Sequence, residues 1–113
     1  MDKKQEAGLH DFLNLDIRTG TILEAEDFKE ALKPAYKLKI DFGELGILKS
    51  SAQICELYST QEIMGRQIIA IVNFPSKQIA NFMSECLVLG IPTKEGVVLL
   101  DVERRVKNGS AIS

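Results

Sequence analysis

The stretch YKLKIDF, residues 36–42, decides the fold, because apolar and charged side chains alternate along it without a break. In an extended chain its charged residues fall on one side and its apolar residues on the other. This period of two predicts a strand with one face toward a core and one face toward water. The sequence GELG, residues 43–46, then indicates a tight turn, and residues 47–49 form the expected hairpin partner.

The segment before this hairpin, residues 17–25, also has a strand pattern. Its inward positions are predicted to be Ile17, Thr19 and Thr21, and the alternation loses its phase just after Gly20. A glycine beside a change of phase predicts a bulge or a sharp coil in the strand. Such a bend lets one strand serve two sides of a small barrel.

Shorter elements follow the hairpin. The sequence STQE, residues 59–62, has the form of a capping box and predicts a short helix over about 60–64. Three further strands are expected at residues 67–73, 86–89 and 97–100, with residues 90–96 as the connection between the last two. A coiled first strand, a hairpin, and a short helix after the third strand predict an all-β protein. The expected architecture is a five-stranded β-barrel of the oligonucleotide/oligosaccharide-binding (OB) fold.

A five-stranded barrel closes near Gly90 and leaves apolar residues without cover. These are residues 97–100 and the N-terminal Leu9, Phe12 and Leu13, which share one face of a short helix. They either fold back on the barrel or meet a symmetric partner, and we expect a homodimer in which the two extensions form the interface. The expected division is an N-terminal helical extension over residues 1–13 and the barrel domain over residues 14–113.

Composition is that of one ordinary globular domain. The chain has 113 residues, 45% of them hydrophobic and 27% charged, with a formal net charge of -2. Such a balance does not attract polyanions over the whole surface, so nucleic-acid binding needs a local basic patch. No apolar run approaches the roughly 20 residues of a membrane span and no signal segment is visible, so we expect a cytoplasmic protein without membrane insertion.

Residues for catalysis are sparse. His10 is the single histidine and lies in the N-terminal segment, and no phosphate loop, dinucleotide fingerprint or metal-ligand spacing is found. Cys55 and Cys86 stand far apart and are expected to be small buried or half-buried thiols. We therefore predict a binding protein with no catalytic residues, no metal and no cofactor.

Lysines supply one candidate binding surface. Lys37 and Lys39 stand two residues apart on the outward face of a predicted strand, and Lys49 and Lys77 are placed to join them. They form either a modest phosphate-contacting patch or a set of charges that keep the strand soluble and guard its edge.

The segment from Pro75 to Glu85 supplies the second candidate surface. Phe82 and Met83 are adjacent, so in an extended segment they point to opposite sides and cannot both be buried. An exposed methionine or phenylalanine among polar residues is typical of an adaptable peptide-binding surface. Phe74, at the end of a strand, is expected in the core rather than as a stacking platform.

Several strings of this sequence resemble those of the tRNA-binding-domain family of OB modules. They are LDIRTGTI, KLKIDFG, KSSAQI, MGRQIIAIVNFP and SECLVLG, and they span most of residues 13–109. Within the family the chain is most similar to the CsaA-type export chaperones. The resemblance implies a dimeric OB barrel that binds unfolded or precursor polypeptides and assists their export, or, as the alternative, a module that binds tRNA in trans.

The resemblance also implies a site. The expected peptide-binding residues are Ser50, Ser51, Gln53, Asn73, Phe74, Ile79, Phe82, Met83, Ser84 and Glu85, and the expected nucleic-acid contacts are Lys37, Lys39, Lys49 and Lys77. Each polar residue in the first set has the alternative role of capping a strand end. Ala80-Asn81 stand where tRNA-binding relatives have Arg-Gly, and the loss of the arginine fork weakens the expectation of tight tRNA binding. A third reading, a module that docks on a larger enzyme, predicts a monomer.

Overall fold

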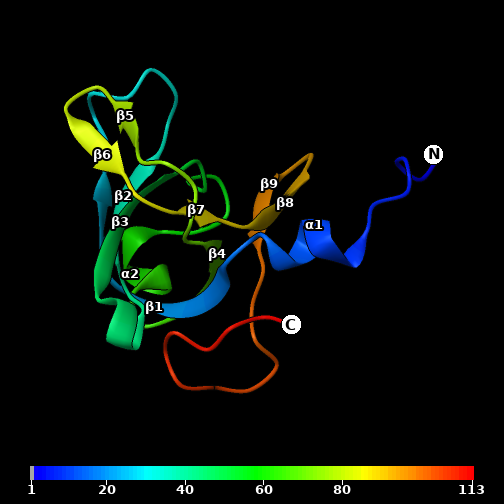
Figure 1. Ribbon diagram of the computed structural model, residues 1–113. Helices are drawn as coiled ribbons and strands as arrows, with labels where there is room; N and C mark the ends of the chain where they lie inside the picture. The colour runs from blue at the N-terminus through cyan, green and yellow to red at the C-terminus, as the bar shows by residue number, and fades with distance from the viewer. Residues whose placement is uncertain (1) are drawn as a thin grey trace.

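The hairpin predicted from residues 36–49 forms strands β2 (Tyr36–Asp41) and β3 (Ile47–Ala52), joined by the 3-10 turn η1 (Gly43–Leu45). The structure is a computed structural model that describes residues 2–113 (Figure 1). Along β2 the side chains alternate between buried and more exposed positions, as the sequence pattern requires. The two strands pair in register from Tyr36 opposite Ala52 to Asp41 opposite Ile47.

Strand β1 (Ile17–Asp27) is long and bent, and it serves two sides of the barrel. Its first half, residues 17–21, pairs with β4 (Gln67–Ile71), and its second half, residues 21–27, pairs with β2. The register shifts between Ile22 and Glu24, which is the bulge that the change of phase predicted.

The predicted inward phase of β1 was wrong at two positions. Thr19 and Thr21 are buried, at 2% and 7% exposure, but their hydroxyls face the C-terminal segment rather than the barrel core. The core positions are instead Gly20 and Ile22. A β-carbon added at Gly20 would lie 2.7 Å from both Ile40 Cγ2 and Phe42 Cε1. Glycine is therefore required here because two core side chains occupy the space of a side chain.

The five strands of the main sheet follow the order β3-β2-β1-β4-β7, with β7 at Leu87–Val88, and neighbouring strands are antiparallel. The short helix α2 (Thr60–Ile63) lies between β3 and β4 and begins with the predicted capping box, in which the Ser59 hydroxyl accepts from the backbone of Glu62. Main-chain and side-chain bonds from residues 84–86 to β3 bring the two edges of the sheet together. The five-stranded, nearly closed barrel of the prediction is thus confirmed.

The barrel core is a single apolar cluster. Its fully buried members are Ile22, Leu38, Ile40, Phe42, Ile63, Ile68 and Ala70. Tyr36 is buried beside them and donates a hydrogen bond from its hydroxyl to the Tyr58 carbonyl at 2.7 Å. Three strands supply most of these side chains, so the core depends on the β1-β2-β4 arrangement.

Two small hairpins extend the barrel. The first joins β5 (Lys77–Ile79) to β6 (Phe82–Ser84) and lies over one end of the sheet, and the second joins β8 (Gly90–Thr93) to β9 (Gly96–Leu99) (Figure 1). Residues 90–96 were predicted as a connection, but the structure makes most of them a strand. Pro92 is accommodated because β8 pairs on one side only.

The C-terminal segment (residues 105–112) covers the outer face of the first half of β1. Thr19 donates its backbone N–H to the Ser110 carbonyl and accepts from Gly109, while Gln67 exchanges hydrogen bonds with the backbone of Val106. The residues around Asn108 form a turn. This segment explains why residues 19–22 of β1 are all buried, whichever face they lie on.

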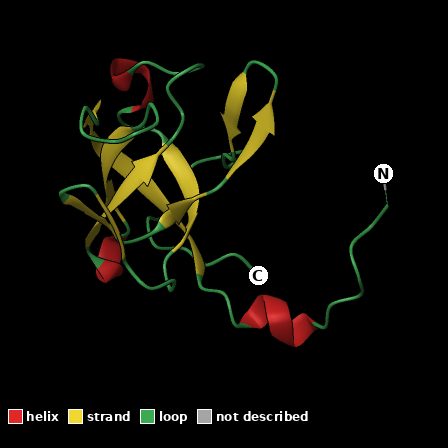
Figure 2. Cartoon of the chain, turned by 90° about the horizontal axis from the view of Figure 1, so that it is seen from above, coloured by secondary structure: helices red, strands yellow, loops and turns green. Residues whose placement is uncertain are grey.

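Helix α1 (Leu9–Leu13) and the β8–β9 hairpin project from the same side of the barrel, as the view in Figure 2, at a right angle to Figure 1, also shows. No residue of α1 is buried. Leu9 and Leu13 of the helix and Ile91 and Val98 of the hairpin are exposed, whereas Leu99 at the end of the hairpin is buried in the core.

Replacing Gly20 by alanine is predicted to lower the free energy of unfolding by about 1–3 kcal/mol, because the added methyl overpacks the core against Ile40 and Phe42. Chemical denaturation monitored by circular dichroism measures the change. Gly8→Ala is the control, since a β-carbon there meets nothing closer than 3.9 Å. Equal stabilities of the two variants would contradict the close packing at Gly20.

Candidate binding groove

Two grooves flank the β5–β6 hairpin. The mouth groove lies between residues 30–33 of the β1–β2 loop and residues 77–80 of the hairpin, and its volume is about 600 Å³. The flank groove lies on the other side of the hairpin, against residues 74–75 and 84–87, and its volume is about 300 Å³. Ser51, Gln53, Lys77 and Ile79 line both grooves. The two grooves therefore meet along the hairpin, and both have sizes in the usual range for ligand sites.

The structure brings most of the predicted peptide-binding residues to these grooves. Those that line one or both are Ser51, Gln53, Phe74, Ile79, Ser84 and Glu85. Phe74 is 44% exposed and lines the flank groove, so the expectation that it is a core residue was wrong. Ser50 was predicted to bind peptide, but its side chain is fully buried and its hydroxyl donates to the Cys86 carbonyl at 3.0 Å. It lines no surface that a ligand reaches.

Ser84 and Glu85 join the hairpin to the edge of β3. The Glu85 backbone N–H donates to the Lys49 carbonyl at 2.7 Å, and the Lys49 N–H donates to Glu85 Oε1 at 2.8 Å. The Ser84 hydroxyl accepts from the backbone N–H of Ser51 at 3.0 Å. These bonds satisfy an otherwise open strand edge, so both residues have the capping role that the sequence left as an alternative.

Asn73 has a similar structural role. Its amide oxygen accepts from the backbone N–H of Asp16 at 2.9 Å, and its amide nitrogen donates to the Asn14 carbonyl at 2.9 Å. The side chain thus holds the entry to β1 and does not line either groove.

Phe82 anchors the hairpin to the barrel. Its ring meets that of Phe28 edge to face, with centroids 5.4 Å apart, and Lys49 Nζ lies 5.2 Å from its centroid. Phe28 itself is 4% exposed and begins the β1–β2 loop. Edge-to-face aromatic pairs and cation–π contacts each add to the burial energy. The contact therefore connects the two walls of the mouth groove. Met83, the next residue, is 41% exposed and lines neither groove, so the two adjacent side chains differ in surroundings, as predicted.

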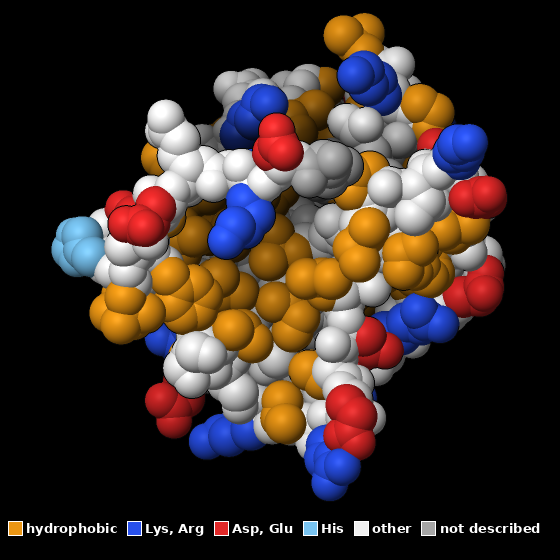
Figure 3. All heavy atoms as spheres, turned by 90° about the vertical axis from the view of Figure 1, so that its right-hand side faces the viewer, with side chains coloured by type: hydrophobic (Ala, Val, Ile, Leu, Met, Phe, Trp, Pro, Cys, Tyr) orange, Lys and Arg blue, Asp and Glu red, His pale blue; other side chains and the backbone are white. Residues whose placement is uncertain are grey.

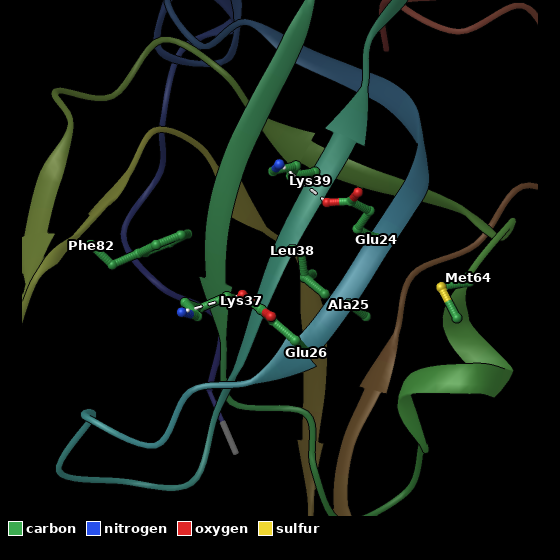
Figure 4. A pocket seen from close by; sticks show the side chains of 8 residues that line it. All are labelled: Glu24, Ala25, Glu26, Lys37, Leu38, Lys39, Met64 and Phe82. Atoms are coloured by element: carbon green, nitrogen blue, oxygen red, sulfur yellow. Dashed lines mark ion pairs between the residues drawn. The ribbon is translucent and has the colours of Figure 1, made fainter.

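Carboxylates neutralise two of the predicted phosphate contacts. On the outer face of β1 and β2, Lys37 Nζ lies 3.3 Å from Glu26 and Lys39 Nζ lies 3.2 Å from Glu24 (Figure 4). Each lysine stands directly opposite its partner in the strand register. Phe82 and Met64 line the same shallow pocket of about 330 Å³. Cross-strand pairs of this kind leave the face nearly neutral.

The other two lysines differ from this pair. Lys49 and Lys77 form no ion pair with any residue in the range 2–113. Lys49 is held over the Phe82 ring, whereas Lys77 is exposed and lines both grooves. Lys77 is thus the one predicted phosphate contact that faces a groove without a neutralising carboxylate partner in the described chain.

The wall of the mouth groove formed by the β1–β2 loop was missed by the sequence analysis. Leu32 at its tip is fully solvent-exposed, with a relative accessibility of 104%. Phe28 and Ala35 close the loop through a backbone hydrogen bond of 3.0 Å. The signal in the sequence was an apolar residue isolated among charged ones, at Leu32 between Glu30 and Lys33.

The two cysteines are free thiols. Cys86 is buried behind the flank groove, and burial raises the pKa of its thiol to about 12. Cys55 is partly buried, and burial likewise raises its pKa. Neither environment favours the thiolate. Among residues 2–113 no three His, Cys, Asp or Glu side chains gather to hold a metal ion, and no helix there has the length and hydrophobicity to span a bilayer.

The fold and the grooves define a small β-barrel binding module, and comparison with known proteins gives its family. The model of a family described as a putative tRNA-binding domain matches residues 17–111, and the chain belongs to this family. Crystal structures of the chaperone CsaA from Bacillus anthracis and Picrophilus torridus superpose with TM-scores of 0.91, at 52% and 51% identity. Each comparison covers 96% of this chain and 100% of the other. The OB-type barrel predicted from the sequence is therefore confirmed.

The curated relatives are longer proteins. A methionine–tRNA ligase of Thermococcus onnurineus is 30% identical over 98% of this chain, and one of Bdellovibrio bacteriovorus is 36% identical over 81%. The matched regions are 16% and 13% of those ligases, so the chain spans about a sixth or less of their length.

Replacing Phe82 by alanine is predicted to loosen both walls of the mouth groove, because Phe28 loses its aromatic partner. Amide hydrogen exchange is expected to speed up at residues 77–84 and also at residues 28–35. The free energy of unfolding is expected to fall by about 1–3 kcal/mol, less than for truncation of a core phenylalanine, since Phe82 is only half buried. Met83→Ala is the matched control. Unchanged exchange at residues 28–35 would show that the two walls are not coupled.

Proposed function

We propose that this chain is a non-catalytic polypeptide-binding protein of the CsaA type, which holds unfolded or precursor polypeptides in the cytoplasm and assists their export. The observation that carries the proposal is the mouth groove, a large open groove with a mixed apolar and polar lining beside a fully exposed leucine. Similarity to two CsaA chaperones along their entire length supports it.

The lining of the mouth groove suits a polypeptide better than a charged polymer. Its apolar contacts come from Ala31, Leu32 and Ile79, and its polar contacts come from uncharged Ser51 and Gln53 together with a few side chains of both signs. No aromatic ring lines it, so bases would have no stacking platform. An unfolded chain offers both small apolar side chains and main-chain polar groups, and both find partners here.

A homodimer is part of the proposal. The exposed apolar side chains of α1 and the β8–β9 hairpin include Leu9, Leu13, Ile91 and Val98, each at least 38% exposed. The side of the molecule from which both elements project has a wide hydrophobic belt framed by charged residues (Figure 3). A continuous apolar surface of this kind is typical of a protein–protein interface. Pairing of two copies through it would leave both mouth grooves open, because these lie at the β5–β6 end of the barrel.

Transfer RNA is the second candidate ligand. The family description and the ligase relatives favour it, and Lys77 is an exposed lysine at the grooves. The ion pairs of Lys37 and Lys39 count against a strong phosphate patch, since each positive charge already has a carboxylate opposite.

The purified protein is predicted to suppress aggregation of a chemically unfolded client enzyme at one dimer per client, measured by light scattering. Leu32→Ser is expected to weaken the suppression about tenfold, because it removes an apolar contact at the groove. Because the Leu32 side chain is fully exposed, the substitution is expected to leave the fold unaffected. The matched control is Leu45→Ser, an exposed leucine at the opposite end of β2 and β3. Absence of suppression by the unmodified protein would overturn the polypeptide-binding proposal.

Binding of tRNA to the same purified protein tests the second candidate ligand. Filter binding of tRNA across a range of salt concentrations is expected to give weak binding, because two of the four predicted phosphate contacts, Lys37 and Lys39, are already paired with carboxylates. A steep fall of a strong affinity with salt, together with loss of binding in Lys77→Ala, would favour tRNA as the ligand.

Ile91→Asp is predicted to convert the dimer to a monomer, because it places a charge among the exposed apolar side chains of the β8–β9 hairpin, opposite Val98. Size-exclusion chromatography with light scattering measures the mass. Leu32→Ser, which changes a leucine at the groove, should remain dimeric. A monomeric unmodified protein would contradict the dimer and favour a module that docks on a larger enzyme.

A further inference from the structure

Strand β5 has an open edge. It pairs with β6 alone among residues 2–113, in the register Ile79 opposite Phe82 and Gln78 opposite Met83. In a hairpin closed by a two-residue turn, the pair that flanks the turn exchanges the main-chain hydrogen bonds. The next residue, Gln78, therefore directs its N–H and C=O away from β6. No group of residues 2–113 bonds to either, and the only bond of Gln78 outside the ladder is from its side chain to the Ala80 carbonyl.

This open edge borders the mouth groove. Four consecutive residues, 77–80, line one wall. Successive side chains of a strand point to opposite sides. If one face of β5 formed this wall, only every second residue would line it. Because residues 77–80 all line it, the wall includes the open backbone edge of β5.

The opposite wall also has open main-chain groups. Residues 30–33 line it consecutively. The internal hydrogen bonds of the loop are from Phe28 N–H to the Ala35 carbonyl and from Ala31 N–H to the Phe28 carbonyl. The main chain of Leu32 and Lys33 has no partner within residues 2–113. The groove thus runs between two backbones that both have unused donors and acceptors.

We propose that an extended polypeptide binds in the mouth groove by adding to β5 as a third strand. Its main chain exchanges hydrogen bonds with Gln78, and its alternate side chains point between the loop and the hairpin. This inference rests on the proposed function and gives it a binding mode. Strand addition takes its affinity from the main chain, which every sequence shares, so it accounts for a site that accepts many clients.

The charge of the groove favours this occupant over a polyanion. Its ionisable lining residues are one glutamate and two lysines, Glu30, Lys33 and Lys77, which leave a single net positive charge for a polyanion to contact. Lysine at an open strand edge also discourages pairing with the same edge of another copy. An extended chain with small or aliphatic side chains is therefore the chemistry that fits.

The test is a methylation scan of a bound peptide. The probe is a fluorescein-labelled peptide of about ten residues made of Ala, Thr, Val and Lys, and its backbone nitrogens are methylated one at a time. Fluorescence anisotropy is expected to show the largest loss of affinity, about two- to tenfold, at the one central position whose N–H faces the Gln78 carbonyl, because Gln78 is the one residue of β5 whose main chain points away from β6.

Two protein variants complete the test. Gln78→Pro removes the outward N–H and is expected to reduce binding by the same factor. Gln78→Ala keeps the N–H and is expected to reduce binding less than the proline variant does. The peptide scan leaves the protein unaltered, so it decides the matter even if the proline variant unfolds the hairpin.

The outcomes separate the inference from the proposed function. Binding of the unmethylated peptide with a flat scan, in which no central position is more sensitive than the others, overturns strand addition and leaves polypeptide binding intact. No binding of the peptide to the unmodified protein overturns both. A mass that grows with protein concentration beyond the dimer would mean that another copy occupies the edge, and overturns the inference as well.

Discussion

The reciprocal bond between Lys49 and Glu85 is the constraint on which the architecture depends. The backbone of Lys49 both accepts from the Glu85 N–H and donates to the Glu85 carboxylate, at 2.7 and 2.8 Å. These bonds close the barrel where β3 would otherwise be an open edge. Because Glu85 directly follows β6, they also fix the base of the β5–β6 hairpin. The same contacts therefore close the barrel and position one wall of the mouth groove. Phe82 connects this wall to the opposite one by packing on Phe28.

The electrostatics of the barrel face follow from strand pairing. The chain belongs to a family described as a putative tRNA-binding domain, yet here Lys37 and Lys39 stand opposite Glu26 and Glu24. Exposed ion pairs of this kind contribute little to stability. Their effect is on recognition, because they remove free positive charge from the face and leave the grooves beside the hairpin as the distinctive surface.

Local patterns in the sequence predicted those elements whose structure is determined locally. Alternation along residues 36–42 gave β2, and the capping box at Ser59 gave α2. The phase of β1 was misread, because Thr19 and Thr21 are buried by a C-terminal segment that is distant in sequence. Residues 90–96 were wrongly predicted as a connection, because glycine and proline usually mark turns between strands. An edge hairpin such as β8–β9 tolerates both residues. Most of the predicted peptide-binding residues line the grooves beside the hairpin. The sequence did not predict the second wall of the mouth groove, because only the tertiary contact of Phe28 with Phe82 brings residues 30–33 there.

The central claim is that an unfolded chain is held between the β1–β2 loop and the β5–β6 hairpin. The most direct measurement is a two-dimensional ¹H–¹⁵N spectrum of the labelled protein during titration with an unfolded client peptide. The account predicts that the largest shift changes occur at the amides of residues 30–33 and 77–80, while those of α1 and the C-terminal segment stay in place. Changes confined to Glu24, Glu26, Lys37 and Lys39, or to the α1 side of the barrel, would contradict it.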